Sequence, residues 1–88
     1  MRFPFSIPLR YRRGDVPDWH ECRTVNISRT GILFHTDQAM SINSIMEILV
    51  QFPSDVTLSC SGSVVRADDS TCAVRIHNCR MISKAAGH

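Results

Sequence analysis

The residues best suited to chemistry in this chain lie in one short segment, Asn26-x-Ser28-x-x-Gly31. This segment places a side-chain amide, a hydroxyl and open backbone N–H groups close together, and such groups can bind phosphate oxygens or the edge of a guanine base. A plain hairpin turn also favours these residue types, because Asn and Ser bond to nearby backbone and Gly adopts positive φ. The order of the three residues indicates a ligand-binding turn as well as a hairpin.

Several arginines could add phosphate-binding groups to this segment. Arg29 lies inside it, as either an exposed loop side chain or a phosphate ligand. Arg66 ends an alternating segment at a rim where a ligand could bind, although the acidic residues that follow are equally good ion-pair partners. Arg10 and its two neighbouring arginines bring positive charge toward the same end of the fold, and they also fit as solvated strand residues.

No pattern in the sequence indicates catalysis or a metal site. The chain has neither a Gly-x-Ser-x-Gly elbow nor a Cys-His signature. His20 lies near Cys22 and His77 near Cys79, but the spacings of structural zinc sites are missing. We therefore expect a binding protein that is not an enzyme and that holds no metal or cofactor.

The charge of the chain is unevenly placed. Its 88 residues are 43 % hydrophobic and 20 % charged, which predicts one globular domain over residues 1–88. Its apolar stretches are far shorter than the roughly 20 residues that cross a bilayer, so no membrane insertion is expected. Residues 1–14 carry four arginines and no acid, whereas residues 15–88 carry six basic and eight acidic residues. A basic arm on a slightly acidic body indicates an anionic partner.

The four cysteines are predicted to be packed, reduced thiols. Prolines interrupt the N-terminal segment and no small-residue cleavage site follows, so it is not expected to be a secretion signal. Thiols that are not exported stay reduced, and no Cys-x-x-Cys pair is present. We therefore expect a cytoplasmic protein with free thiols at Cys22, Cys60, Cys72 and Cys79.

Apolar and polar residues alternate along much of the chain, and this period of two predicts half-buried strands. No segment shows a helical period, so we expect an all-β, six-stranded antiparallel barrel. The expected strands are residues 7–12, about 20–27, 32–36, 46–52, 56–64 and 72–76. The expected core includes Met46, Ile48, Val50, Leu58, Val64, Val74 and Ile76. The expected parts are a basic arm with the first strand (1–14), the rest of the barrel (15–80) and a tail (81–88).

These features together resemble the PilZ domain family, the bacterial receptors for cyclic di-GMP. The resemblance covers most of the chain and is carried by the basic N-terminal segment and by residues 8–12, 24–34 and 62–66. It implies a small six-stranded antiparallel β-barrel. It also implies a signalling domain that binds a nucleotide second messenger.

The resemblance assigns Asn26, Ser28 and Gly31 to the binding of cyclic di-GMP, together with an arm that precedes the barrel. In the family this arm carries an Arg-x-x-x-Arg motif, which is absent here because none of the nine arginines has another four positions on. Arg2 lies at a suitable distance from Asn26 to match the second arginine of that motif. We expect Arg2 to bind the ligand, and the ordered arm to pass the signal to an unidentified bacterial protein partner.

Two other functions stay open at this point. The missing motif arginine would suit a degenerate PilZ-like module that binds no cyclic di-GMP and acts through protein–protein interaction or oligomerisation. The basic arm would suit RNA or single-stranded DNA, but the body of the domain offers no continuous basic groove. A nucleic-acid polymer is therefore not expected as a partner.

Overall fold

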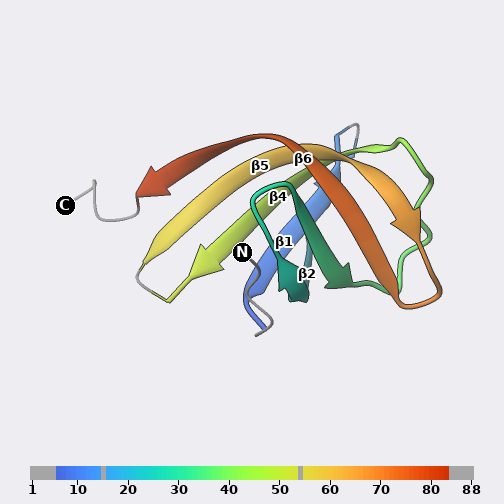
Figure 1. The fold of residues 1–88 in the computed structure, drawn as a ribbon, viewed down its shortest axis with the longest axis horizontal. Coiled ribbons are helices and arrows are strands. Elements are labelled where there is room, and N and C mark those ends of the chain that lie inside the picture. The colour runs from blue at the N-terminus through green and yellow to red at the C-terminus, as the bar shows by residue number, and fades with distance from the viewer. Residues whose placement is uncertain (1–5, 15, 54, 84–88) are drawn as a thin grey trace.

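The computed structural model describes residues 6–14, 16–53 and 55–83, and this part of the chain forms only strands and loops. The strands form a closed barrel in which each neighbouring pair is antiparallel, in the order β1-β2-β3-β6-β5-β4 (Figure 1). They are β1 (Pro8–Arg13), β2 (His20–Ile27), β3 (Gly31–His35), β4 (Ile45–Phe52), β5 (Val56–Ala67) and β6 (Thr71–Ser83). The predicted all-β, six-stranded barrel is confirmed. The described segments contain no helix long and apolar enough to cross a membrane.

The barrel interior is filled by the alternating apolar residues of all six strands. Side chains on successive strand positions point to opposite faces, so every second residue of a strand reaches the core. The buried apolar residues are Ile7, Leu9, Tyr11, Ile27, Ile32, Phe34, Met46, Ile48, Val50, Cys60, Val64, Cys72 and Val74. Of the seven predicted core residues, Leu58 and Ile76 are only partly buried and pack against this cluster.

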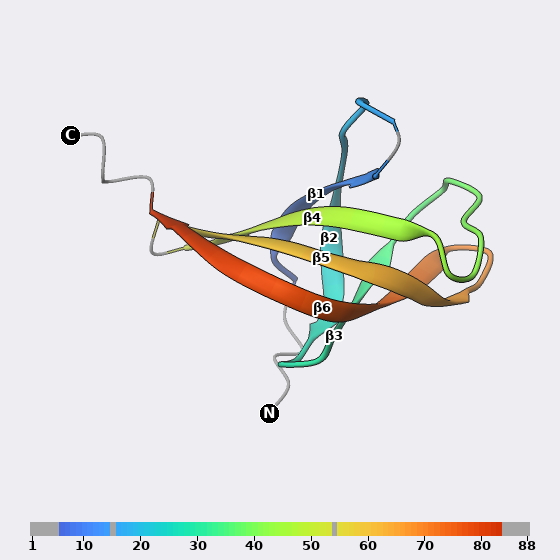
Figure 2. The same cartoon turned by 90° about the horizontal axis from the view of Figure 1, so that it is seen from above.

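These two residues are less buried because β4, β5 and β6 extend past β3 (Figures 1 and 2). β5 pairs with β6 from Ala67 opposite Cys72 to Val56 opposite Ser83. β3 contacts only the first part of β6, opposite residues 71–75. Leu58 and Ile76 lie on the extended part or at its start, where fewer strands cover them. The strand expected at 72–76 therefore continues to Ser83, and residues 81–83 belong to β6 while 84–88 lie outside the described residues.

The expectation of four free thiols is wrong for two of the cysteines. Cys60 and Cys79 form a disulfide that joins β5 to β6. The pairing places them directly opposite each other, because the register shifts after Ser61 and the bulge leaves His77 unpaired. The sequence alone does not show this bulge, so it does not predict that the two cysteines lie opposite each other. Cys22 and Cys72 are free thiols, as expected.

Candidate functional site

The Asn26–Gly31 segment forms the β2–β3 hairpin turn. The Ser28 N–H donates to the Gly31 carbonyl at 2.9 Å and closes the turn. The Ser28 hydroxyl accepts from the Thr30 N–H and donates to the Gly31 carbonyl, both at 3.4 Å. These two contacts are long, so the hydroxyl can exchange them for a ligand at little cost. Arg29 and Thr30 form the exposed tip.

Gly31 is needed in this turn for a different reason from the one predicted. The sequence predicted a positive φ, but no described glycine has one. A Cβ built on Gly31 would lie 3.0 Å from the backbone carbonyl oxygen of Val74. The glycine therefore lets β6 approach the start of β3 closely. The Ile76 N–H donates to the Thr30 carbonyl at 2.8 Å and fixes the turn against β6.

Asn26 carries an unsatisfied polar atom. The register between β2 and β3 shifts between Thr24 and Asn26, and such bulges redirect side chains. The Asn26 Oδ1 atom is buried and has no hydrogen-bond partner among the described residues. Buried acceptors are nearly always paired, and an unpaired one costs about 1–3 kcal/mol. An amide kept at this cost is a candidate for binding a ligand donor.

A surface hollow of about 320 Å³ lies between this turn and the β5–β6 hairpin. Asn26, Ser28 and Gly31 line one side of it. Arg66 and Arg75 line the other side, and Arg75 is paired directly opposite Gly31. The hollow thus combines an amide, a hydroxyl and two guanidinium groups, which is the donor and acceptor set needed for phosphate and guanine.

The two arginines of the hollow are free to turn toward a ligand. Arg66 lies 3.7 Å from the Asp68 carboxylate, an exposed ion pair of little energetic weight. Arg75 is exposed and forms no ion pair with any residue that the structure describes. Arg75 is not among the site residues predicted from the sequence. Alternation indicated only that it points outward, and its position opposite Gly31 depends on the β3–β6 pairing, which the sequence does not show.

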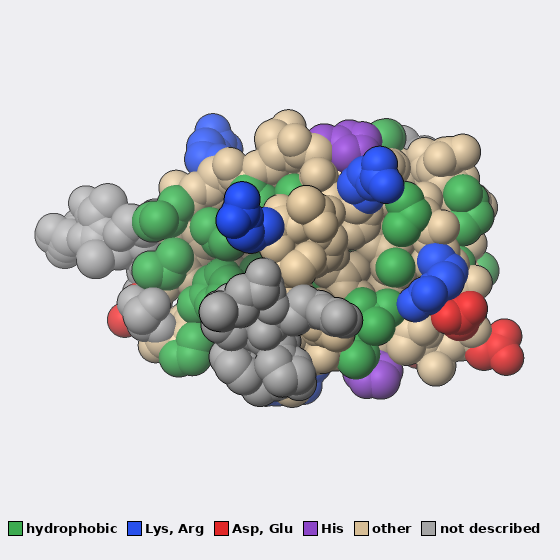
Figure 3. Space-filling model, viewed as in Figure 1, with side chains coloured by type: hydrophobic (Ala, Val, Ile, Leu, Met, Phe, Trp, Pro, Cys, Tyr) green, Lys and Arg blue, Asp and Glu red, His purple; other side chains and the backbone are tan. Residues whose placement is uncertain are grey.

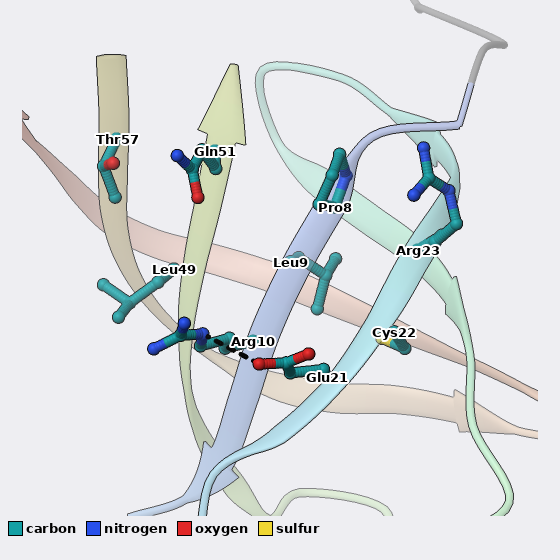
Figure 4. A pocket seen from close by; sticks show the side chains of 9 residues that line it. All are labelled: Pro8, Leu9, Arg10, Glu21, Cys22, Arg23, Leu49, Gln51 and Thr57. Carbon is teal, nitrogen blue, oxygen red and sulfur yellow. Dashed lines mark ion pairs between the residues drawn. The ribbon is translucent and has the colours of Figure 1, made fainter. Parts of the chain in front are cut away.

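The remaining predicted residues do not gather at this hollow. Arg29 is exposed at the turn tip and does not line the hollow. Arg10 lies 3.5 Å from Glu21 on a second hollow of about 480 Å³, formed over β1, β2, β4 and β5 (Figure 4). Arg2 lies outside the described residues. The structure therefore brings Arg66 to the turn and places Arg10 on another face of the barrel.

The two free thiols are not suited to act as nucleophiles. Burial raises the pKa of Cys22 to about 12 and that of Cys72 to about 11. Both are therefore neutral thiols at physiological pH, whereas nucleophilic attack requires the thiolate. No group of three or more His, Cys, Asp or Glu side chains that could hold a metal occurs in the described part of the chain.

Comparisons with known proteins agree with this fold. A family model described as "PilZ domain" matches residues 1–86. The PilZ domain of CeSA from a cellulose-synthesizing bacterium is similar in structure, with a TM-score of 0.73 and 16 % identity over 89 % of this chain and 81 % of that one. The Bacillus subtilis inhibitor of motility (MotI/DgrA) has a TM-score of 0.76 and 11 % identity over 97 % of this chain. This chain spans only 43 % of that second protein. No curated protein sequence matches.

Proposed function

This chain belongs to the PilZ domain family, and from that premise we propose that it binds cyclic di-GMP in the hollow between the β2–β3 turn and the β5–β6 hairpin. PilZ domains are regulatory binding domains rather than catalysts. The proposed role is therefore that of a receptor that reports the level of the second messenger to a protein partner.

The unpaired Asn26 Oδ1 atom is the observation that carries this proposal. A guanine presents N–H donors beside an acceptor oxygen, and an asparagine amide matches such an edge. Rotation of the amide about its Cβ–Cγ bond would present Oδ1 to a donor in the hollow. The ligand would then satisfy an atom that the free protein leaves unpaired. Ser28 would add a hydroxyl to the same edge or to a neighbouring phosphate.

Arg66 and Arg75 would supply the positive charge that the ligand's two phosphates require. A guanidinium group binds phosphate oxygens or the O6 and N7 atoms of guanine in a bidentate manner. The chain lacks the Arg-x-x-x-Arg motif of the family. We propose that these two barrel arginines take over part of its role, with Arg2 contributing from the arm. Ordering of the arm on the bound ligand would transmit the signal.

Calorimetric titration with cyclic di-GMP at two salt concentrations tests this proposal. Arg75→Ala removes a charge-assisted contact worth about 1.5–3 kcal/mol, so affinity should fall about ten- to a hundredfold and its salt dependence should flatten. Arg10→Ala is the matched control, because it removes an exposed strand arginine from a different face. Equal losses in the two variants would show that the effect is one of net charge, and that the site lies elsewhere.

Variants of the turn provide a second test. Asn26→Ala and Ser28→Ala should each weaken cyclic di-GMP binding while the fold persists, since neither side chain is needed to close the turn. Wild-type protein that gives no heat at high micromolar nucleotide would contradict the proposal.

The cytoplasmic location expected from the sequence stays a prediction. A thiol count on protein prepared without reductant bears on it, because disulfides are rare in a reducing compartment.

A further inference from the structure

The C-terminal half of β6 has a neighbouring strand on one side only. β5 pairs with β6 as far as Ser83, whereas β3 pairs with it only at residues 71–75. Both ribbon views show this half of β6 running past β3 with β5 beside it (Figures 1 and 2). Residues 77–83, here called the open edge, therefore present backbone groups that no strand in the described part of the chain pairs with.

The disulfide position identifies which backbone groups face outward. Cys60 and Cys79 are directly opposite each other, with their Cα atoms 4.1 Å apart. This close spacing is typical of a non-hydrogen-bonded antiparallel pair, whose N–H and C=O groups point away from each other. The backbone N–H and C=O of Cys79 thus point away from β5, and by alternation so do those of Met81 and Ser83. These are the groups that an added strand would need.

The open edge lacks most of the features that protect edge strands. Natural edges are blunted by short length, by Pro, by several charges or by a bulge within the edge. The bulge at His77 lies at its start, and residues 78–83 contain no proline and a single charged residue, Arg80. Met81 and Ile82 lie within the edge and are 64 % and 41 % exposed. The disulfide holds this strand to β5, so the edge is formed in advance of any partner.

The charges on this hairpin indicate the kind of partner. Strands β5 and β6 contain the arginines Arg66, Arg75 and Arg80 and no acidic residue. Arg66 is paired with Asp68 in the turn between these strands, and the β1 arginines Arg10 and Arg12 are paired with carboxylates of neighbouring strands. Within the described residues, Arg80 makes no ion pair. Figure 3 shows basic side chains spread over one face of the molecule, with the acidic ones near its ends.

We propose that the open edge binds an extended acidic segment of a partner protein by strand addition, with a carboxylate against Arg80 and an apolar residue against Met81. A second copy of the chain is a poorer occupant. Antiparallel self-pairing over the whole edge is centred on residue 80, so it would place two Arg80 side chains opposite each other, and like charges in that position destabilise a sheet. This inference rests on the proposed function in one respect: the acidic segment would belong to the protein partner to which the domain reports the level of cyclic di-GMP. The strand pairing itself requires no nucleotide.

Synthetic peptides test the proposal in the absence of cyclic di-GMP, so its failure is distinct from failure of the nucleotide site. The probe is the blocked peptide Thr-Val-Thr-Val-Glu-Val-Thr, and its control carries Lys in place of Glu. By NMR titration, the Glu peptide should bind at least tenfold more tightly than the Lys peptide. The amides of Cys79 and Met81 should shift and exchange more slowly with solvent. Arg80→Glu should reverse the preference between the two peptides.

A pair of variants at Met81 separates backbone pairing from side-chain contact. Met81→Pro removes an outward N–H without removing a β5–β6 hydrogen bond, and edge strands tolerate proline at such positions. It should abolish binding, whereas Met81→Ala should weaken it only a fewfold. If Met81→Pro fails to fold, a peptide N-methylated at alternate residues takes its place and should not bind.

Three results would overturn the proposal. Full binding by Met81→Pro, or by the N-methylated peptide, would exclude strand addition. Dimerisation of the free chain that Met81→Pro abolishes would assign the edge to a second copy. Slow exchange of the Cys79 and Met81 amides in the free monomer would show that another part of the chain already covers the edge.

Discussion

Substitutions of two polar residues on β2, Thr24 and Asn26, test through their effects on protein stability whether the Asn26 Oδ1 atom is unpaired. The Thr24 Oγ1 atom accepts a hydrogen bond from the Ile7 N–H at 2.9 Å, and both residues are buried. Asn26 lies two positions along the same strand, and its Oδ1 atom has no partner among the described residues. Loss of the side-chain oxygen should therefore have opposite consequences at the two positions.

The expected magnitudes follow from these contacts. Thr24→Val keeps the shape of the side chain but leaves the buried Ile7 N–H unpaired, which should lower the free energy of unfolding by about 1–3 kcal/mol. Asn26→Ala removes an unpaired acceptor that costs about 1–3 kcal/mol, and it removes packing comparable to one methylene, about 0.8 kcal/mol. The free energy of unfolding should thus stay within about 1 kcal/mol of wild type or rise.

Urea denaturation followed by the fluorescence of the single tryptophan, Trp19, measures both variants. Titration of the same preparations with cyclic di-GMP measures the affinity of each variant for the nucleotide. We expect Asn26→Ala to lose affinity while keeping its stability, and Thr24→Val to lose stability. A destabilisation of Asn26→Ala as large as that of Thr24→Val would refute the reasoning, because the amide would then be a structural hydrogen-bonding group of the bulge.

Other predictions concern the core and the cysteines. Gly62→Ala should destabilise the domain by about 3 kcal/mol or more in urea denaturation, because its Cβ would overlap the Arg75 carbonyl oxygen of β6, a strand that pairs here with both β3 and β5. Protein denatured without reductant should show two free thiols, and removal of the Cys60–Cys79 disulfide, which closes a loop of 19 residues, should cost about 3 kcal/mol. Burial raises the pKa of Cys22 to about 12 and that of Cys72 to about 11, whereas the thiol pKa in the unfolded chain is 9.0. The contribution of these neutral thiols to the free energy of unfolding is therefore complete below pH 9.0 and is lost as the pH rises toward 11–12. Urea titrations at pH 8 and above 10 should show this loss, and it should shrink in Cys22→Ala.

The sequence was sufficient to predict the barrel because its information is local. Alternation over residues 46–52 and 56–64 fixes which side chains of β4 and β5 face inward. Turn residues between such segments mark where the chain reverses direction. The family resemblance supplied the identity of the ligand, cyclic di-GMP, and the expected contribution of Arg2 from the arm. These features need no knowledge of which strand lies beside which.

The parts that the sequence did not predict all depend on pairing between distant strands. Arg75 joins the site only because β6 lies against β3, and Cys60 meets Cys79 only because a bulge shifts the register. The close approach at Gly31 also involves the β6 backbone, and it replaces the positive φ that local turn chemistry suggested. A bulge moves every later pairing by one residue, so alternation within one strand cannot specify its neighbours.

The proposed nucleotide site is tested most directly by an NMR titration of the wild-type chain with cyclic di-GMP that follows every backbone amide. We expect saturable shifts concentrated in the turn at residues 26–31 and in the facing residues 65–66 and 73–75. Shifts concentrated in the hollow around Arg10 and Glu21, or no shifts at high micromolar nucleotide, would contradict it.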